Sequence, residues 1–148
     1  SLCAQVTCPY TLDASRLNVA TLDLTTRRPE PGFRPLDSLF VDARAVLAPE
    51  RLPKSPLSAS YVIDGGLSVA PDAFGPDAGS TVSIPVTTFV RDLIRGETSS
   101  GEDPPQSLAL LSFSEPLSLL LTSFVGPGGE GEPVLRLILT TSDTVEVR

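Results

Sequence analysis

One stretch of the chain follows the spacing of an amphipathic helix. Its four apolar side chains recur at positions i, i+1, i+4 and i+5, and its charged side chains face the other way. Thr87 or Thr88 can cap the start, and Gly96 can adopt the left-handed conformation that ends a helix. The pattern predicts a helix over about Thr87–Arg95. It would pack on a sheet through Phe89, Val90, Leu93 and Ile94.

Most of the remaining chain alternates apolar and polar residues with a period of two, which is typical of half-buried strands. The clearest case is Ser38–Leu47. Ser15–Leu24 changes parity midway, which predicts a β-bulge near Ala20–Thr21. Further short strands are predicted at Ala4–Thr7, Ala59–Ile63, Leu67–Val69, Thr81–Ile84, Ser107–Phe113, Leu117–Phe124, Val134–Thr140 and Thr144–Val147.

This series of short strands with a single helix predicts an all-β fold, specifically an antiparallel jelly-roll-like β-sandwich with one short α-helix. We expect residues 1–13 to form an N-terminal arm and residues 14–148 to form a single β-sandwich domain. The strands at 107–113 and 117–124 are apolar on both faces. We therefore expect them to be central in a sheet, or to be covered by the helix or by a partner chain.

Composition and charge narrow the classes of partner. The 148 residues carry a formal net charge of -7, which argues against nucleic acid and anionic membranes as partners. No apolar run is long enough for a membrane helix, so we expect no membrane insertion. The sequence has no Met, which indicates a processed product or an excised fragment. Removal of a signal peptide is the simplest account, and it predicts a secreted or cell-surface protein. High Pro with little Asn and Gln is typical of proteins from hot habitats, with biased codon usage as the alternative source of this composition.

The two cysteines, Cys3 and Cys8, lie beside the N-terminus of the sequence. In an exported protein we expect them to form a small disulfide loop, with two reduced thiols as the alternative. A lipid-anchored Cys3 is a further alternative, which the bulky Leu2 before it disfavours. A metal site would need further soft ligands, which the sequence does not supply.

The candidate chemistry is sparse. Without His, the Ser-His-Asp and Cys-His nucleophile systems are excluded. Lys54 and Ser55 form the one neighbouring lysine–serine pair, between two prolines, and we expect this lysine to be exposed rather than catalytic. A carboxylate pair for glycoside chemistry stays open among the acidic residues. We expect no enzyme activity and no cofactor.

Two weaker binding candidates come from loops and aromatic residues. Asp64, Asp72 and Asp77 supply the oxygen ligands that Ca²⁺ prefers, but their spacing does not match a calcium-binding loop, so turn-forming Asp is the simpler interpretation. Tyr10 and Tyr61 are the two tyrosines in a chain without Trp. They are the candidate aromatics for stacking on a polysaccharide.

The segment from about residue 83 to residue 141 resembles the second half of the DNRLRE-type domain, a family of exported bacterial β-sandwich modules. The resemblance rests on Val86 to Gly96 (VTTFVRDLIRG), Leu108 to Leu110 (LAL) and Pro133 to Thr140 (PVLRLILT). These segments correspond to the helix, to the strand after the polar loop and to the closing strand of that family. The resemblance implies a β-sandwich fold and a location outside the cell.

The function that fits these features is a non-catalytic structural subunit that is secreted or held at the cell surface. It would assemble with copies of itself in a fibre, appendage or surface layer, and the N-terminal arm could add a strand to a neighbour. Two alternatives stay open at this point, a carbohydrate-binding module and a capsid decoration protein. The expected partner is therefore a second copy of the chain, or a polysaccharide under the first alternative.

Overall fold

The computed structural model describes residues 11–62, 66–76, 78–113, 120 and 122–140. The strands expected at Ala4–Thr7 and Thr144–Val147 lie outside these residues. So do residues 117–119 and 121 of the strand expected at Leu117–Phe124, whose described residues form only an isolated bridge at residue 124. The fold described here therefore concerns the central part of the chain.

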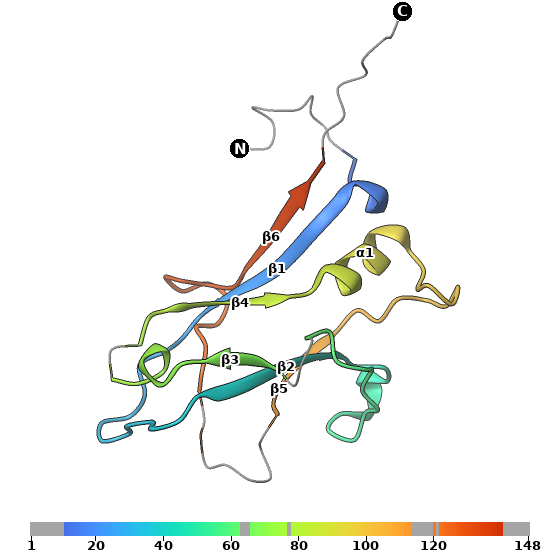
Figure 1. The fold of residues 1–148 in the computed structure, drawn as a ribbon. Helices are drawn as coiled ribbons and strands as arrows, with labels where there is room; N and C mark the ends of the chain where they lie inside the picture. The colour runs from blue at the N-terminus through green and yellow to red at the C-terminus, as the bar shows by residue number, and fades with distance from the viewer. Residues whose placement is uncertain (1–10, 63–65, 77, 114–119, 121, 141–148) are drawn as a thin grey trace, which may run out of the picture.

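The described residues form six strands, three short 3-10 turns and one α-helix (Figure 1). One sheet has the order β4-β1-β6 and the other has the order β3-β2-β5, and all four strand pairings are antiparallel. The expected all-β character with one short helix is confirmed. In chain order the elements are η2 (Ala14–Arg16), β1 (Leu17–Thr25), β2 (Leu39–Ala45), η3 (Pro49–Arg51), β3 (Leu67–Val69), η4 (Pro71–Ala73), β4 (Thr81–Pro85), α1 (Thr87–Arg95), β5 (Leu108–Ser112) and β6 (Val134–Leu139).

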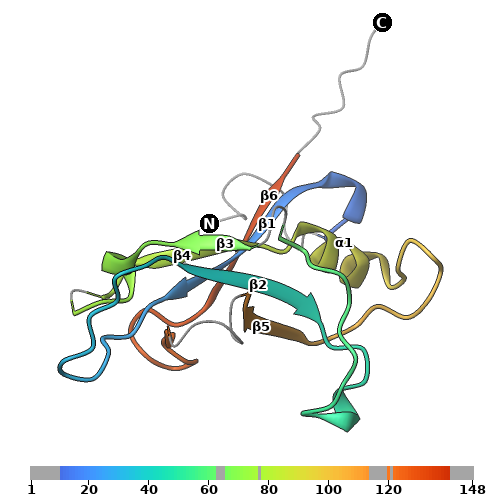
Figure 2. The same ribbon diagram turned by 60° about the horizontal axis from the view of Figure 1, so that its bottom comes forward.

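Both sheets contribute to one hydrophobic core. Leu24 and Ile84 come from the first sheet, Leu39 and Val41 from the second, and Phe74 follows η4. Each of these side chains is buried, and burying an aliphatic or phenyl side chain contributes about 1.5–3 kcal/mol. The two sheets lie as two layers, with α1 beside them at one end (Figure 2).

The irregularity in β1 lies earlier than the sequence predicts. The register between β1 and β6 shifts between Leu17 and Val19, so Asn18 is the extra residue. Because of this shift, Leu17 and Ala20 are both buried although they are three residues apart. Asn18 stays at the surface, where its Nδ2 donates to Thr140 Oγ1 over 2.7 Å. The predicted position near Ala20–Thr21 is therefore wrong.

The strand predicted at Ala59–Ile63 is also wrong, since none of its described residues, 59–62, forms a strand. Serine hydroxyls replace part of the expected backbone ladder beside β2. Ser58 Oγ accepts from Ala45 N over 2.9 Å, and Ser60 Oγ hydrogen-bonds Asp42 Oδ1. Tyr61 N still donates to Ala43 O over 2.9 Å. The segment thus follows β2 without becoming a strand.

Helix α1 has the bounds that the sequence predicts, but it begins differently. Val86 occupies the N-cap position and makes no side-chain cap hydrogen bond. The Thr87 hydroxyl instead accepts from Ala20 N over 3.0 Å, which fixes the start of the helix to β1. Gly96 ends the helix with φ of 81°, and its N–H donates to Asp92 O over 2.9 Å. The end is as expected, and a capping role for Thr87 or Thr88 is wrong.

Among the residues that the structure describes, strand β5 lies at the edge of its sheet. Among the described residues it pairs only with β2, and β6 is likewise at the edge of its sheet. The expectation that residues 107–113 lie centrally in a sheet stays a prediction, because residues 114–119 and 121 lie outside the described residues. Within the described part of the chain, these two edge strands leave one side of the two-layer arrangement open.

Candidate functional site

The open side is the strongest candidate site, because the residues that the structure describes assemble no other chemistry. Nowhere among them do three or more His, Cys, Asp or Glu side chains gather as a metal site would require. Asp72 is exposed in the first turn of η4, and the other two calcium candidates, Asp64 and Asp77, lie outside these residues. Lys54 is exposed, as expected, beside Ser55. No helix in the described ranges is long and apolar enough to cross a membrane.

Tyr61 packs against the core and is not part of an exposed binding surface. Its ring lies edge-on to Phe89 of α1, with 5.9 Å between the ring centroids. The side chain is half-buried against the core, and this burial raises the pKa of its hydroxyl. The second candidate aromatic, Tyr10, and the two cysteines, Cys3 and Cys8, lie outside the described residues.

Strand β6 exposes apolar side chains on both of its faces. Val134, Leu135 and Ile138 are 49%, 51% and 53% exposed. Leu135 lies on the face toward the core, with Leu137, whereas Val134 and Ile138 lie on the outer face. The one charged residue of the strand, Arg136, is engaged by Asp23 of β1 over 3.0 Å. The free edge therefore has no lysine or unpaired charge of its own to discourage strand pairing.

The backbone groups of β6 alternate between β1 and the free edge. Thr140 N donates to Arg16 O over 2.9 Å, so its N–H points toward β1. Because successive N–H groups of a strand point to opposite sides, those of Ile138 and Arg136 also face β1. The N–H groups of Leu135, Leu137 and Leu139 then face the free edge. This edge thus offers donors and acceptors at alternate residues.

An apolar groove of about 400 Å³ runs between the open edge and the helix. All four helix residues predicted to pack on a sheet line it: Phe89 and Val90 are buried, Ile94 is half-buried and Leu93 is exposed. Its walls come from α1, from β1 and β6, and from the first residue of β5. The lining residues are all apolar: Leu12, Leu22, Val86, Phe89, Val90, Leu93, Ile94, Leu108, Leu135 and Leu137.

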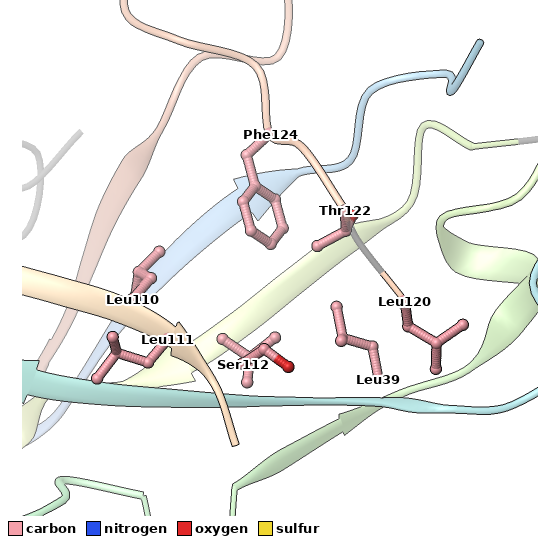
Figure 3. Close-up of a pocket in the computed structure, with 8 residues that line it drawn as sticks. Leu39, Leu110, Leu111, Ser112, Leu120, Thr122 and Phe124 are labelled. Atoms are coloured by element: carbon pink, nitrogen blue, oxygen red, sulfur yellow. The ribbon is translucent and has the colours of Figure 1, made fainter. Parts of the chain in front are cut away.

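A second cavity of about 350 Å³ lies further along the same side (Figure 3). Leu108 lines the groove and Leu110 lines this cavity, so consecutive inward residues of β5 connect the two. Phe124 closes its far end, where residue 124 bridges to Thr26. The hydroxyls of Ser112 and Thr122 are buried at this cavity and have no hydrogen-bond partner among the described residues. An unsatisfied buried hydroxyl costs about 1–3 kcal/mol.

Sequence patterns predict doubly apolar strands at residues 107–113 and 117–124, and they do not single out β6 as exposed. The signal was present in Val134–Leu139, where apolar residues occupy both parities around Arg136. What the pattern could not show is that β6 lies at an edge, since strand order depends on contacts far apart in the sequence.

Comparison with known proteins adds no further information about this site. No protein-family model, curated protein or solved structure matches the chain. The interpretation of the open side therefore rests on its own geometry.

Proposed function

We propose that this chain is a non-catalytic structural subunit that assembles with copies of itself through the free edge of β6. One observation carries the proposal: among the described strands, β6 lies at a sheet edge, and its Val134, Leu135 and Ile138 are each about half exposed, on both faces. Native proteins usually protect such an edge with charges, proline or a covering element. Between Val134 and Leu139 the strand has no proline, and its arginine is engaged by Asp23.

Strand addition from another copy would pair the free backbone groups of this edge and cover its exposed apolar side chains. The outward N–H and C=O groups of Leu135, Leu137 and Leu139 would pair with the added backbone. The apolar side chains on the two faces would lose contact with water, at about 25 cal/mol per Å² of buried apolar surface. A second copy is the simplest source of such a strand, since every copy of the chain presents the same edge.

The proposal includes the finer features that the sequence suggested. These are a jelly-roll-like β-sandwich, membership of the DNRLRE-type domains and a location outside the cell, where fibres, appendages and surface layers occur. Two antiparallel sheets around one core support the first of these. The alternative of a carbohydrate-binding module has less support, because Tyr61 is half-buried against Phe89.

The test is the assembly state of the full chain, measured by sedimentation velocity over a wide concentration range and by negative-stain electron microscopy. We expect oligomers or filaments that grow with concentration. The variant Ile138→Lys places a charge on the outer face of β6, outside the core, and should shift assembly to at least about tenfold higher concentration. Leu36→Lys is the matched control, because Leu36 is 88% exposed in the loop before β2.

The control should assemble as the unmodified chain does. A chain that stays monomeric at high concentration contradicts the proposal. An equal effect of the Ile138→Lys and Leu36→Lys variants also contradicts it, since net charge rather than the β6 edge would then control assembly.

A further inference from the structure

Among the described strands, the first sheet has two edges, β4 and β6, and they differ in the donors that they offer (Figure 1). Val86 N donates to Ala20 O over 2.9 Å, so the N–H groups of Val82 and Ile84 also face β1. Position 85 then faces the free edge of β4, and Pro85 has no N–H to donate there. The β4 edge is thus protected by a proline, whereas the β6 edge has a donor at every outward position.

The outward backbone groups of β6 are arranged symmetrically about Leu137. Leu135, Leu137 and Leu139 direct their N–H and C=O groups to the free edge, and Leu137 is the middle one of the three. A strand with this arrangement can pair with a copy of itself, because facing residues of an antiparallel pair exchange both hydrogen bonds. A two-fold axis beside Leu137 opposes the Leu137 residues of two copies. It also opposes Leu135 of each copy to Leu139 of the other.

We infer that the partner of β6 is β6 of a second copy, paired antiparallel about a two-fold axis at Leu137. This inference rests on the proposed function, and it names the strand and the register of the contact. The first sheets of the two copies then form one continuous sheet in the order β4-β1-β6-β6-β1-β4. Because a two-fold contact closes on itself, the pair of copies is the unit from which a fibre or a layer is built.

The charge of Arg136 selects this register. Edge-facing residues of the two copies must oppose each other, so the axis lies beside Arg136, Leu137 or Ile138. An axis at Arg136 places the two arginines directly opposite each other, and like charges in that position destabilise a sheet. An axis at Ile138 pairs three residues of β6, at 137–139, whereas the axis at Leu137 pairs five, at 135–139. The axis at Leu137 therefore gives the longest ladder without opposed like charges.

The same register covers apolar side chains on both faces of β6. On the face toward the core, Leu135 and Leu137 line the apolar groove and Leu139 packs on the core. The leucines of the two copies meet around the axis on this face. On the outer face, each exposed Ile138 lies opposite Arg136 of the other copy, where the aliphatic stem of the arginine packs beside it. The contact thus accounts for apolar exposure on two faces of one strand.

The first test compares two charges of opposite sign at one exposed position of the full chain. In the proposed register residue 138 faces Arg136 of the other copy. The carboxylate of Ile138→Glu is therefore attracted across the contact, and the ammonium of Ile138→Lys is repelled. We expect Ile138→Glu to assemble at least about threefold more tightly than Ile138→Lys, as measured by sedimentation velocity. Net charge alone predicts the opposite order, since the chain carries a formal charge of -7.

The matched controls are Leu36→Glu and Leu36→Lys, at an exposed position in the loop before β2. They add the same charges outside β6, so they should assemble within about twofold of each other or favour the lysine variant. Circular dichroism checks that all four variants are folded. Equal assembly of the two Ile138 variants, or tighter assembly of Ile138→Lys, would overturn the inference.

The second test determines the register with pairs of cysteines, in a chain whose Cys3 and Cys8 are changed to serine. In the proposed register Val134 lies opposite Thr140 of the other copy in a non-hydrogen-bonded pair. The Cα atoms of such a pair are about 4.5 Å apart, which a disulfide can span. After Val134→Cys and Thr140→Cys are mixed and oxidised, we expect a species of twice the chain mass that disappears on reduction.

Other registers give other cross-links. An axis at Arg136 opposes Val134 to Ile138, and an axis at Ile138 opposes the two Ile138 residues. In the proposed register both of these pairs are diagonal neighbours about 7–8 Å apart, too far for a disulfide. Cross-linking of Val134→Cys with Ile138→Cys, or of Ile138→Cys alone, would therefore overturn the inference. Leu36→Cys mixed with Thr140→Cys is the control and should give no cross-link.

The two proposals fail in distinguishable ways. If the chain assembles and Ile138→Lys weakens assembly, but Val134→Cys and Thr140→Cys do not cross-link, the proposed function stands and this inference falls. If the full chain stays monomeric at high concentration, both fall.

Discussion

Arg136 of β6 binds Asp23 of β1 across the sheet, with both its Nε and its Nη2 3.0 Å from Asp23 Oδ2. The pair is asymmetric, because the aspartate side chain is 8% exposed and the arginine side chain is 66% exposed. The Asp23 carboxylate is thus buried, and the exposed Arg136 guanidinium covers it from the solvent side. Ser83 and Arg136 together lower the pKa of the Asp23 carboxyl, which keeps it ionised. This contact attaches the exposed strand to the body of the fold.

Removing the cation should therefore cost more than a surface ion pair usually does. We expect Arg136→Ala to lower the free energy of unfolding by about 1–3 kcal/mol, since Asp23 is left buried without its charged partner. The control is Arg51→Ala, because Arg51 and its partner Glu50 are both largely exposed, and it should change stability by less than about 0.5 kcal/mol. Urea denaturation measures both. Equal small losses would show that the Asp23 carboxylate is solvated in solution.

The attachment of α1 to β1 can be tested at two adjacent threonines. Thr87→Val removes the hydroxyl that accepts from Ala20 N, and it leaves the N–H of a fully buried residue unpaired. We expect a loss of about 1–3 kcal/mol in the free energy of unfolding. Thr88 is exposed, so Thr88→Val should change stability by less than about 0.5 kcal/mol. If Thr88→Val were the more damaging change, a side-chain cap at Thr88 would have to be reconsidered.

Acid should destabilise the protein through Asp42 as well as through Asp23. Burial acts to raise the pKa of the Asp42 carboxyl, but hydrogen bonds from Ser60 and Arg44 outweigh it and leave the pKa below its ordinary value of 3.8. Because the pKa is lower in the folded than in the unfolded chain, this stabilisation is complete above about pH 5 and is lost as the pH falls through the folded value.

The measurement is the free energy of unfolding between pH 7 and pH 2, from urea titrations. We expect a plateau down to about pH 5 and a fall below about pH 4. Asp42→Asn should flatten the acid fall, whatever its effect on stability at pH 7, and Asp37→Asn, at an exposed position, should leave the slope unchanged. A slope that the Asp42→Asn variant leaves intact would assign the acid sensitivity to other carboxyl groups.

Local patterns predicted local structure well. The bounds of α1 and its end at Gly96 followed from apolar spacing and from the left-handed conformation that glycine allows, and both depend on neighbours within one or two helical turns. The alternation at Ser38–Leu47 likewise predicted β2, because one face of that strand is buried and the other carries Asp42 and Arg44.

Features that depend on distant residues were missed. The Thr87 hydroxyl has the chemistry of a cap, but a backbone amide from β1, 67 residues earlier, is its partner. Residues 59–62 alternate as a strand would, yet Ser60 binds the side chain of Asp42 instead of leaving the backbone to pair. The edge position of β5 and β6, and with it the candidate site, follows from strand order, which no local pattern encodes.

The order of strands in the first sheet also has a consequence for how the molecule is made. Strand β1 lies between β4 and β6, so Thr25 is paired with Thr81 while Leu17 is paired with Leu139. During translation, the central strand β1 is therefore synthesised first, and its partner β6 follows more than a hundred residues later. Contacts so far apart in sequence are slow to form. The sheet around β1 therefore stays incomplete until β6 has been synthesised.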